Sequence, residues 1–132
     1  MSKIIGIIRI EHKVQKEKIK VCCFIRTLGS ESKMEQQAKR LTEFVAQFDE
    51  LDLVYEIRDY NSGSEIDRMK IEELIEGIEQ GEYNLIFITN TDRIANDPKE
   101  VAAFCDRVQA LGGMIYSLEE GPCTIESDDE WL

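Results

Sequence analysis

Arginines stand beside acids and hydroxyl residues in three short segments of the chain, 26–32, 59–68 and 90–97. The planar guanidinium group of arginine matches the geometry of a phosphate group better than the lysine ammonium does. If these segments meet in the fold, their arginines could hold a phosphate or another anion. If they do not meet, the charges are ordinary solvated loop residues, which contribute little to stability.

Metal, redox and triad chemistry have much less support. The chain has four cysteines and no C-x-x-C pair among them: Cys22, Cys23, Cys105 and Cys123. The favoured interpretation is that they are small buried hydrophobic side chains in a reducing compartment. His12 is the only histidine, which leaves a metal cluster short of ligands and a Ser-His-Asp triad short of its base. We expect neither a metal nor a cofactor.

Alternating apolar runs and amphipathic stretches predict the elements that must position the three segments. Strands are expected at 18–26, 51–57, 85–88 and 114–118, and helices at about 33–49, at about 69–81 and from Pro98 to Leu111. Ser32 and Glu35 form a capping-box pattern at the start of the first helix. The order β-α-β-α-β-α-β predicts an α/β fold, a three-layer α/β/α sandwich with a mostly parallel central sheet. Ligand sites in such folds lie at the C-terminal ends of the strands, where the three polar segments begin.

The first 17 residues precede this pattern and carry five isoleucines between Ile4 and Ile10, followed by a charged connector. We expect an extra N-terminal strand there, because so many apolar side chains need a partner surface. The predicted organisation is an N-terminal extension over 1–17, one domain over 18–121 and an acidic tail over 122–132.

The formal net charge of -11 has the wrong sign for a chain whose main task is to grip phosphates. No apolar run approaches the roughly 20 residues that a bilayer-spanning helix needs. The apolar run near the N-terminus is also too short for a secretory signal. We therefore expect a cytoplasmic protein without membrane contact.

Taken together, the polar segments resemble the N-terminal catalytic domain of the serine recombinases, the resolvase and invertase family. The resemblance runs over about 21–121. The family's aromatic-x-Arg-x-Ser motif corresponds to Phe24-Ile-Arg26-Thr-Leu28 in this chain. Gln37 follows at the spacing of the family's helical glutamine.

Two further blocks carry the resemblance. The family's strand-ending Asp, Ser-Gly loop and later Asp-Arg correspond to Asp59, Ser62-Gly63 and Asp67-Arg68. Its Leu-Asp-Arg-Leu-x-Arg motif corresponds to Thr91-Asp92-Arg93-Ile94-Ala95-Asn96. Each block alone is a weak signal, and the three in order within one α/β pattern are much stronger.

The resemblance implies an enzyme that attacks a DNA phosphodiester with a serine hydroxyl and stores the bond as a phosphoserine link. Arg26, Arg68 and Arg93 would offset the charge that builds on the phosphate oxygens. Asp92 would orient a neighbouring guanidinium, and Ser62 would lie in the rim of the site.

This chain departs from the family pattern at two positions. The place of the nucleophile is occupied by Leu28, which has no attacking atom, and Asn96 replaces an arginine of the clamp. Ser30 is a weak substitute nucleophile, because it lies two residues beyond the expected place. As structural residues, Ser30 would belong to a turn and Ser32 would cap the helix.

We therefore expect a catalytically inactive resolvase-like domain that regulates or partners DNA recombination, including that of a mobile genetic element. One alternative is an active DNA recombinase that uses Ser30. Another is a flavodoxin-like module that binds a small ligand, although no Gly-rich phosphate loop follows the first strand.

The expected partner is a protein, either another chain or a second copy of this one. DNA binding is expected to be weak without an added DNA-binding domain. The resemblance implies that the chain stops where the family's long dimerisation helix would begin, and we find no helix-turn-helix pattern in the sequence.

Overall fold

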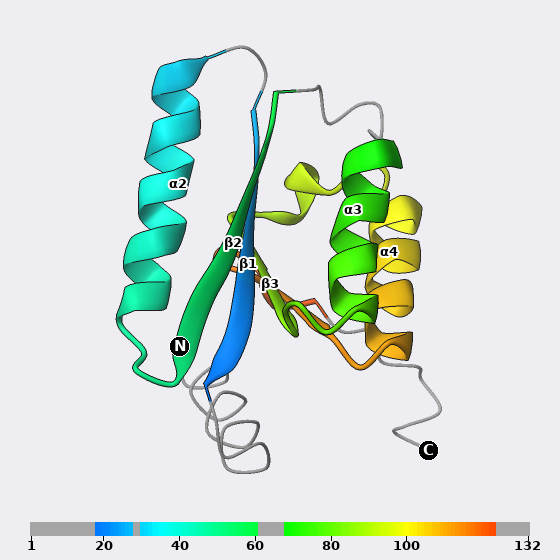
Figure 1. Ribbon diagram of the computed structural model, residues 1–132. Coiled ribbons are helices and arrows are strands. Elements are labelled where there is room, and N and C mark those ends of the chain that lie inside the picture. Colours follow the sequence, from blue (N-terminus) through cyan, green and yellow to red (C-terminus); the bar gives the residue numbers. More distant parts are fainter. Residues whose placement is uncertain (1–17, 28–29, 61–67, 124–132) are drawn as a thin grey trace.

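A mostly parallel sheet runs through the middle of the protein (Figure 1). The computed structural model describes residues 18–27, 30–60 and 68–123, and of residues 68 and 69 only the backbone. The strands are β1 (Ile19–Arg26), β2 (Leu51–Asp59), β3 (Leu85–Ile88), β4 (Met114–Ser117) and β5 (Gly121–Pro122). They lie in the order β2-β1-β3-β4-β5, and only the β4–β5 pair is antiparallel. The predicted sheet is confirmed, and the short strand β5 is an addition that the apolar pattern did not predict.

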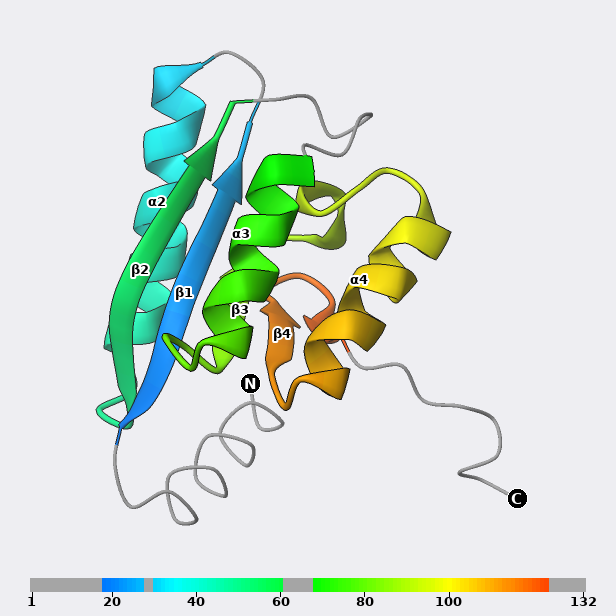
Figure 2. The ribbon, with the colours of Figure 1, turned by 45° about the vertical axis from the view of Figure 1, so that its right-hand side comes forward.

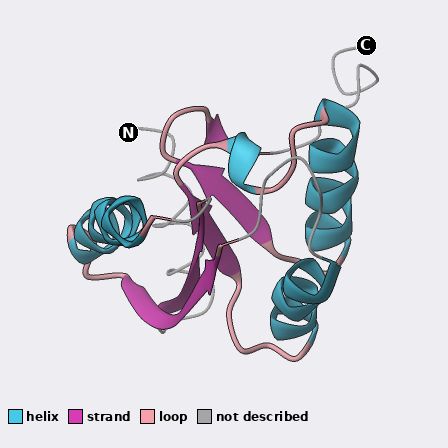
Figure 3. Ribbon diagram, turned by 90° about the horizontal axis from the view of Figure 1, so that it is seen from above, coloured by secondary structure: helices cyan, strands magenta, loops and turns pink. Residues whose placement is uncertain are grey.

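Helices cover both faces of this sheet. α2 (Glu31–Ala46) packs on one face, and α3 (Arg68–Glu79) and α4 (Pro98–Ala110) pack on the other (Figure 1, Figure 3). Figure 2 shows α3 and α4 next to each other on their shared face. The three-layer α/β/α sandwich predicted from the order of elements is therefore confirmed.

The core consists of two apolar layers, one on each side of β1. Cys22 and Phe24 pack toward α3 and α4, and Val21, Cys23 and Ile25 pack toward α2. All five side chains are fully buried. Burial raises the pKa of the Cys23 thiol to about 12, which keeps it protonated. The interpretation of this neighbouring cysteine pair as buried hydrophobic residues is confirmed.

Local hydrogen bonds decide where the first helix begins. The Ser30 hydroxyl accepts the backbone N–H of Lys33 at 3.3 Å, so Ser30 is the N-cap and α2 starts at Glu31. The prediction that Ser32 caps this helix was therefore wrong, as was the assignment of Ser30 to a turn. Glu35, the other half of the predicted capping box, directs its carboxylate to Arg58 of β2.

The last helix begins and ends close to its predicted limits. The Asp97 carboxylate caps it by accepting the backbone N–H of Lys99 at 3.0 Å, and Pro98 occupies the first turn. The helix stops at Ala110, so Leu111 lies at its C-terminal cap and is 42% exposed. The predicted helix, which ran to Leu111, was therefore one residue too long.

β2 forms one edge of the sheet, and its register against β1 shifts between Val21 and Cys22. This irregularity accompanies three partly exposed apolar side chains, Leu53, Val54 and Tyr55. Bulges of this kind increase local twist and make an edge harder to extend.

Several predictions concern residues outside the described ranges. The expected N-terminal strand between Ile4 and Ile10 lies there, and so do Leu28, Ser62 and the tail after Cys123. The limits proposed at 17/18 and 121/122 stay predictions. Within the part of the chain that the structure describes, no helix is long and apolar enough to cross a membrane.

Candidate functional site

Arg26 lies at the C-terminal end of β1 and is 2% exposed. Its Nε and Nη2 atoms donate to Asp59 Oδ2 at the end of β2, at 2.9 and 2.6 Å. Its Nη1 donates to the Ile94 carbonyl at 3.2 Å, and its guanidinium lies 5.4 Å from the centre of the Phe24 ring. One buried side chain thus joins the ends of β1 and β2 to the loop after β3.

Arg93 comes from the short 3-10 helix η1 (Thr91–Arg93) that follows β3. Its Nε donates to the Thr89 hydroxyl and its Nη1 donates to the Arg26 carbonyl, both at 3.1 Å. Two arginines that are 67 residues apart in the sequence therefore meet at one end of the sheet. This is the end where parallel α/β folds place ligands.

Gln37 of α2 reaches the same point. Its Nε2 donates to the Arg26 carbonyl at 3.0 Å, so this oxygen accepts hydrogen bonds from both Gln37 and Arg93. The side chain of Gln37 is buried, and its Oε1 has no hydrogen-bond partner among the described residues. The glutamine singled out by its spacing thus lies beside the two arginines.

Other candidate residues lie farther out or are not described. Asp92 of η1 and Asn96 of the turn after it are exposed, and both border a cavity of about 310 Å³ between η1, α4 and β5. Arg68 begins α3, but only its backbone is described. The structure brings Arg26 and Arg93 together and gives no side-chain position for Arg68, Leu28 or Ser62.

Glu120, which the sequence patterns did not single out, holds the Asp92–Arg93 segment in place. Its carboxylate accepts from the Thr91 backbone N–H at 3.1 Å, from the Thr91 hydroxyl at 2.5 Å and from the Ser117 hydroxyl. Burial alone would raise the pKa of this carboxyl, but the hydrogen bonds from Ser117 and Thr91 outweigh it and lower the pKa. Since 29 residues separate the partners, no local sequence signal could have found this contact.

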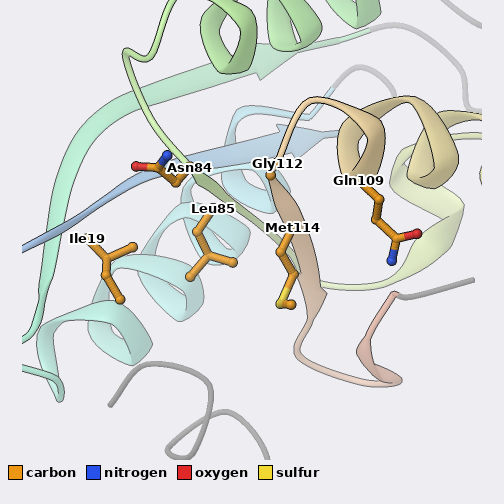
Figure 4. Close-up of a pocket in the computed structure, with 7 residues that line it drawn as sticks. Ile19, Asn84, Leu85, Gln109, Gly112 and Met114 are labelled. Atoms are coloured by element: carbon orange, nitrogen blue, oxygen red, sulfur yellow. The ribbon is translucent and has the colours of Figure 1, made fainter. Parts of the chain in front are cut away.

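A second cavity lies at the opposite end of the sheet (Figure 4). It measures about 260 Å³, and the residues that line it are Ile19, Asn84, Leu85, Gln109, Gly112, Gly113 and Met114. None of these side chains ionises, so the described residues around this cavity offer no general acid, base or anion clamp. The arginines and acids gather at the other end, which is therefore the candidate active site.

Comparison with known proteins agrees with this geometry. Residues 21–130 match the family model described as "Resolvase, N terminal domain". The chain therefore belongs to the resolvase family. A search of curated proteins gave no match.

Solved structures show the same fold. A resolvase family site-specific recombinase from Streptococcus pneumoniae aligns with a TM-score of 0.69 at 22% identity, covering 83% of this chain and 79% of the other. The C-terminal catalytic domain of ISC1926 TnpA, an IS607-like serine recombinase, gives 0.68 at 18% identity over 86% and 75%. The N-terminal catalytic domain of TP901-1 integrase gives 0.68 at 20% identity over 77% and 78%. At these identities, the likeness establishes the fold alone.

Proposed function

We propose that this resolvase-family domain does not cleave DNA strands and instead regulates or partners recombination through protein contacts. Two features of the sequence support the loss of cleavage. Leu28 stands where the family carries its serine nucleophile, and a leucine side chain has no atom that can attack phosphorus. Asn96 stands where the family carries an arginine, so one positive charge of the phosphate clamp is missing.

The observation that carries the proposal is how Arg26 uses its hydrogen bonds. Its Nε, Nη1 and Nη2 atoms all donate to groups of the protein, and the side chain is 2% exposed. A phosphate would have to compete with the Asp59 carboxylate for the same donors. Arg93 likewise spends its Nε and Nη1 on Thr89 and Arg26. Arginines held in this way brace the ends of the strands.

The two alternatives are weaker. Ser30 caps α2 through its hydroxyl, so its use as a displaced nucleophile would cost the helix its N-cap, worth about 1 kcal/mol. A flavodoxin-like ligand module would need another explanation for the family match over residues 21–130.

Partners follow from charge. A net charge of -11 disfavours autonomous binding to DNA, whose phosphates favour basic surfaces. A protein partner, either a second copy or another recombination protein, is the expected contact. The cytoplasm, where a recombinase partner would meet DNA, is the proposed location, and a mobile genetic element is the proposed setting.

The test is a search for a covalent protein–DNA adduct. The purified chain is incubated with a pool of supercoiled plasmids with random inserts, denatured, and analysed by gel and by mass spectrometry. An active serine recombinase with its own site serves as positive control. We expect no adduct from this chain. An adduct mapped to Ser30 would overturn the proposal of inactivity, and tight sequence-selective binding to a duplex would overturn the proposal that the chain works through proteins.

A further inference from the structure

Two of the cysteines lie in the same part of the fold although they are far apart in the sequence. Cys105 is on α4, and Cys123 directly follows β5. Each thiol shifts the pKa of the other, and Cys123 packs against the apolar cluster that contains Cys105. The Cys123 thiol itself donates to the Gly121 carbonyl at 3.7 Å. The Cys123 backbone N–H donates to the Ile115 carbonyl at 2.9 Å, which fixes this residue beside β4.

Both cysteines also border the 310 Å³ cavity beside the candidate active site. Cys105 itself is only 4% exposed, while Cys123 is half-buried. The cavity therefore gives a small reagent a route to the pair. Cys22 and Cys23 differ in this respect, because they are fully buried and line neither of the two cavities described above.

We propose that Cys105 and Cys123 are a site of reversible disulfide formation, closed by a small organic disulfide that enters the cavity. A cystine requires two thiols that can meet with little backbone movement, and these two belong to the same apolar cluster and border the same cavity. The pairing links α4 to the end of the sheet and is independent of the proposed function in recombination.

The chemistry proceeds in two exchange steps. A Cys105 thiolate attacks one sulfur of the small disulfide, forming a mixed disulfide and releasing one thiolate of the reagent. Cys123 then loses its proton to solvent and attacks the Cys105 sulfur, forming the cystine and releasing the second thiolate. The protein pair is oxidised, and one molecule of reagent is reduced to two thiols. Interaction with Cys123 outweighs burial and lowers the pKa of Cys105, which favours Cys105 as the first attacking group.

The bond would affect the candidate site through Glu120. The ring closed by the cystine contains Glu120, whose carboxylate holds Thr91 at the start of the Asp92–Arg93 segment. A covalent bond between Cys123 and α4 would hold the turn that carries Glu120, and through Glu120 it would restrain the Asp92–Arg93 segment.

The experiment treats the full chain with an excess of 2-hydroxyethyl disulfide, alkylates the remaining thiols and digests the protein with trypsin. Cleavage after Lys99 and Arg107 places Cys105 in the peptide 100–107 and Cys123 in the segment from 108 to the end of the printed sequence. We expect these two peptides to be joined until a reductant is added. We also expect the Tm to rise by roughly 5–15 °C on oxidation and to return on reduction.

Cys123→Ser is the matched control, since it keeps the size and polarity of the side chain. In this variant the reagent should stay on Cys105 as a mixed disulfide, and the rise in Tm should be absent. In the wild-type chain, a lasting mixed disulfide, recovery of both cysteines as alkylated thiols, or a cystine that involves Cys22 or Cys23 would each overturn the proposal. This readout holds even if the variant is unstable.

Discussion

Arg26 Nη2 and Asp59 Oδ2 lie 2.6 Å apart, and both side chains are 2% exposed. The pair joins the C-terminal ends of β1 and β2 where water cannot screen the two charges. Buried pairs of this kind add little net stability over well-packed apolar residues, but removing one partner strands the other charge in the core. The effect on stability of replacing either residue therefore depends on whether the other is still charged.

Asp59→Ala should lower the free energy of unfolding by about 3–5 kcal/mol, because it leaves the Arg26 charge buried without its counterion. The double replacement Arg26→Met with Asp59→Leu should cost much less. Urea denaturation measures both. Glu35→Ala is the control, since it breaks the Glu35–Arg58 pair, which is as short at 2.5 Å but largely exposed; its cost should stay within about 1 kcal/mol. An equal cost for Asp59→Ala and Glu35→Ala would contradict the prediction.

Glu120→Gln should flatten the loss of stability in acid. The pKa of Glu120 lies below its ordinary value of 4.5 in the folded protein. A depressed carboxyl pKa gives stability that is present above the unfolded-state pKa and is lost as the pH falls through the folded-state pKa. The wild-type chain should therefore lose more stability than the variant between about pH 6 and about pH 3. Urea unfolding across this range tests it, with Glu79→Gln as a control for net charge; parallel curves for wild type and Glu120→Gln would refute it.

Gly77→Ala should destabilise α3, although alanine normally stabilises a helix interior by about 1 kcal/mol relative to glycine. A methyl group at this position would lie 2.2 Å from Cζ and Oη of Tyr83. Tyr83 is buried, and its hydroxyl donates to the Leu74 carbonyl at 3.0 Å, so the ring has little freedom to move. We expect a loss of about 1–3 kcal/mol by thermal or urea unfolding. Glu79→Ala, on the exposed side of the same helix, is the control and should leave stability nearly unchanged. A gain of stability from Gly77→Ala would contradict the prediction and would mean that the Tyr83 ring can move aside.

Leu28→Ser alone should produce no covalent DNA adduct above background. It supplies the missing hydroxyl, but Asn96 still leaves the clamp without a charge, and residues that act as a catalytic unit do not contribute additively. Combining it with Asn96→Arg restores that charge, but Arg26 still donates to Asp59, so any adduct in the plasmid-pool assay should stay small. An adduct from the single variant equal to that from the double variant would mean that Asn96 has no part in the inactivity.

Removal of residues 1–17 should change the association state or the stability of the chain. The isoleucines between Ile4 and Ile10 are more apolar surface than an unpaired strand can safely expose. Light scattering and thermal unfolding of the full chain and of a version that starts at Lys18 compare the two. Two monomers of equal stability would mean that the segment pairs with nothing.

The regular elements could be predicted because their signals are local. The apolar run at β3 and the spacing of Met34, Leu41 and Val45 on α2 depend on neighbours within a few residues. The contacts that shape the candidate site are not local. Nothing near Ser32 reveals that Glu35 will pair with Arg58 of another element, so the capping-box pattern pointed to the wrong serine.

The site residues themselves were only partly predictable. The motif spacing indicated Arg26 and Arg93, and the structure brings them together. The motif spacing could not indicate that the charge of Arg26 would be paired with the Asp59 carboxylate, because each residue matched the family pattern in a separate block. Glu120 had no motif at all, and its role follows from where the turn after β4 meets the loop after β3.

The order of the strands has a consequence for synthesis on the ribosome. β1 leaves the ribosome first among the described strands, yet it lies between β2 and β3. After β2 is made, one edge of β1 stays open until Leu85–Ile88 emerges. The cover over Cys22 and Phe24 stays incomplete for longer, because α3 is made before β3 and α4 only after it. A nascent chain halted in this interval presents an apolar face and an unpaired parallel edge, which are the features that chaperones bind and aggregates extend.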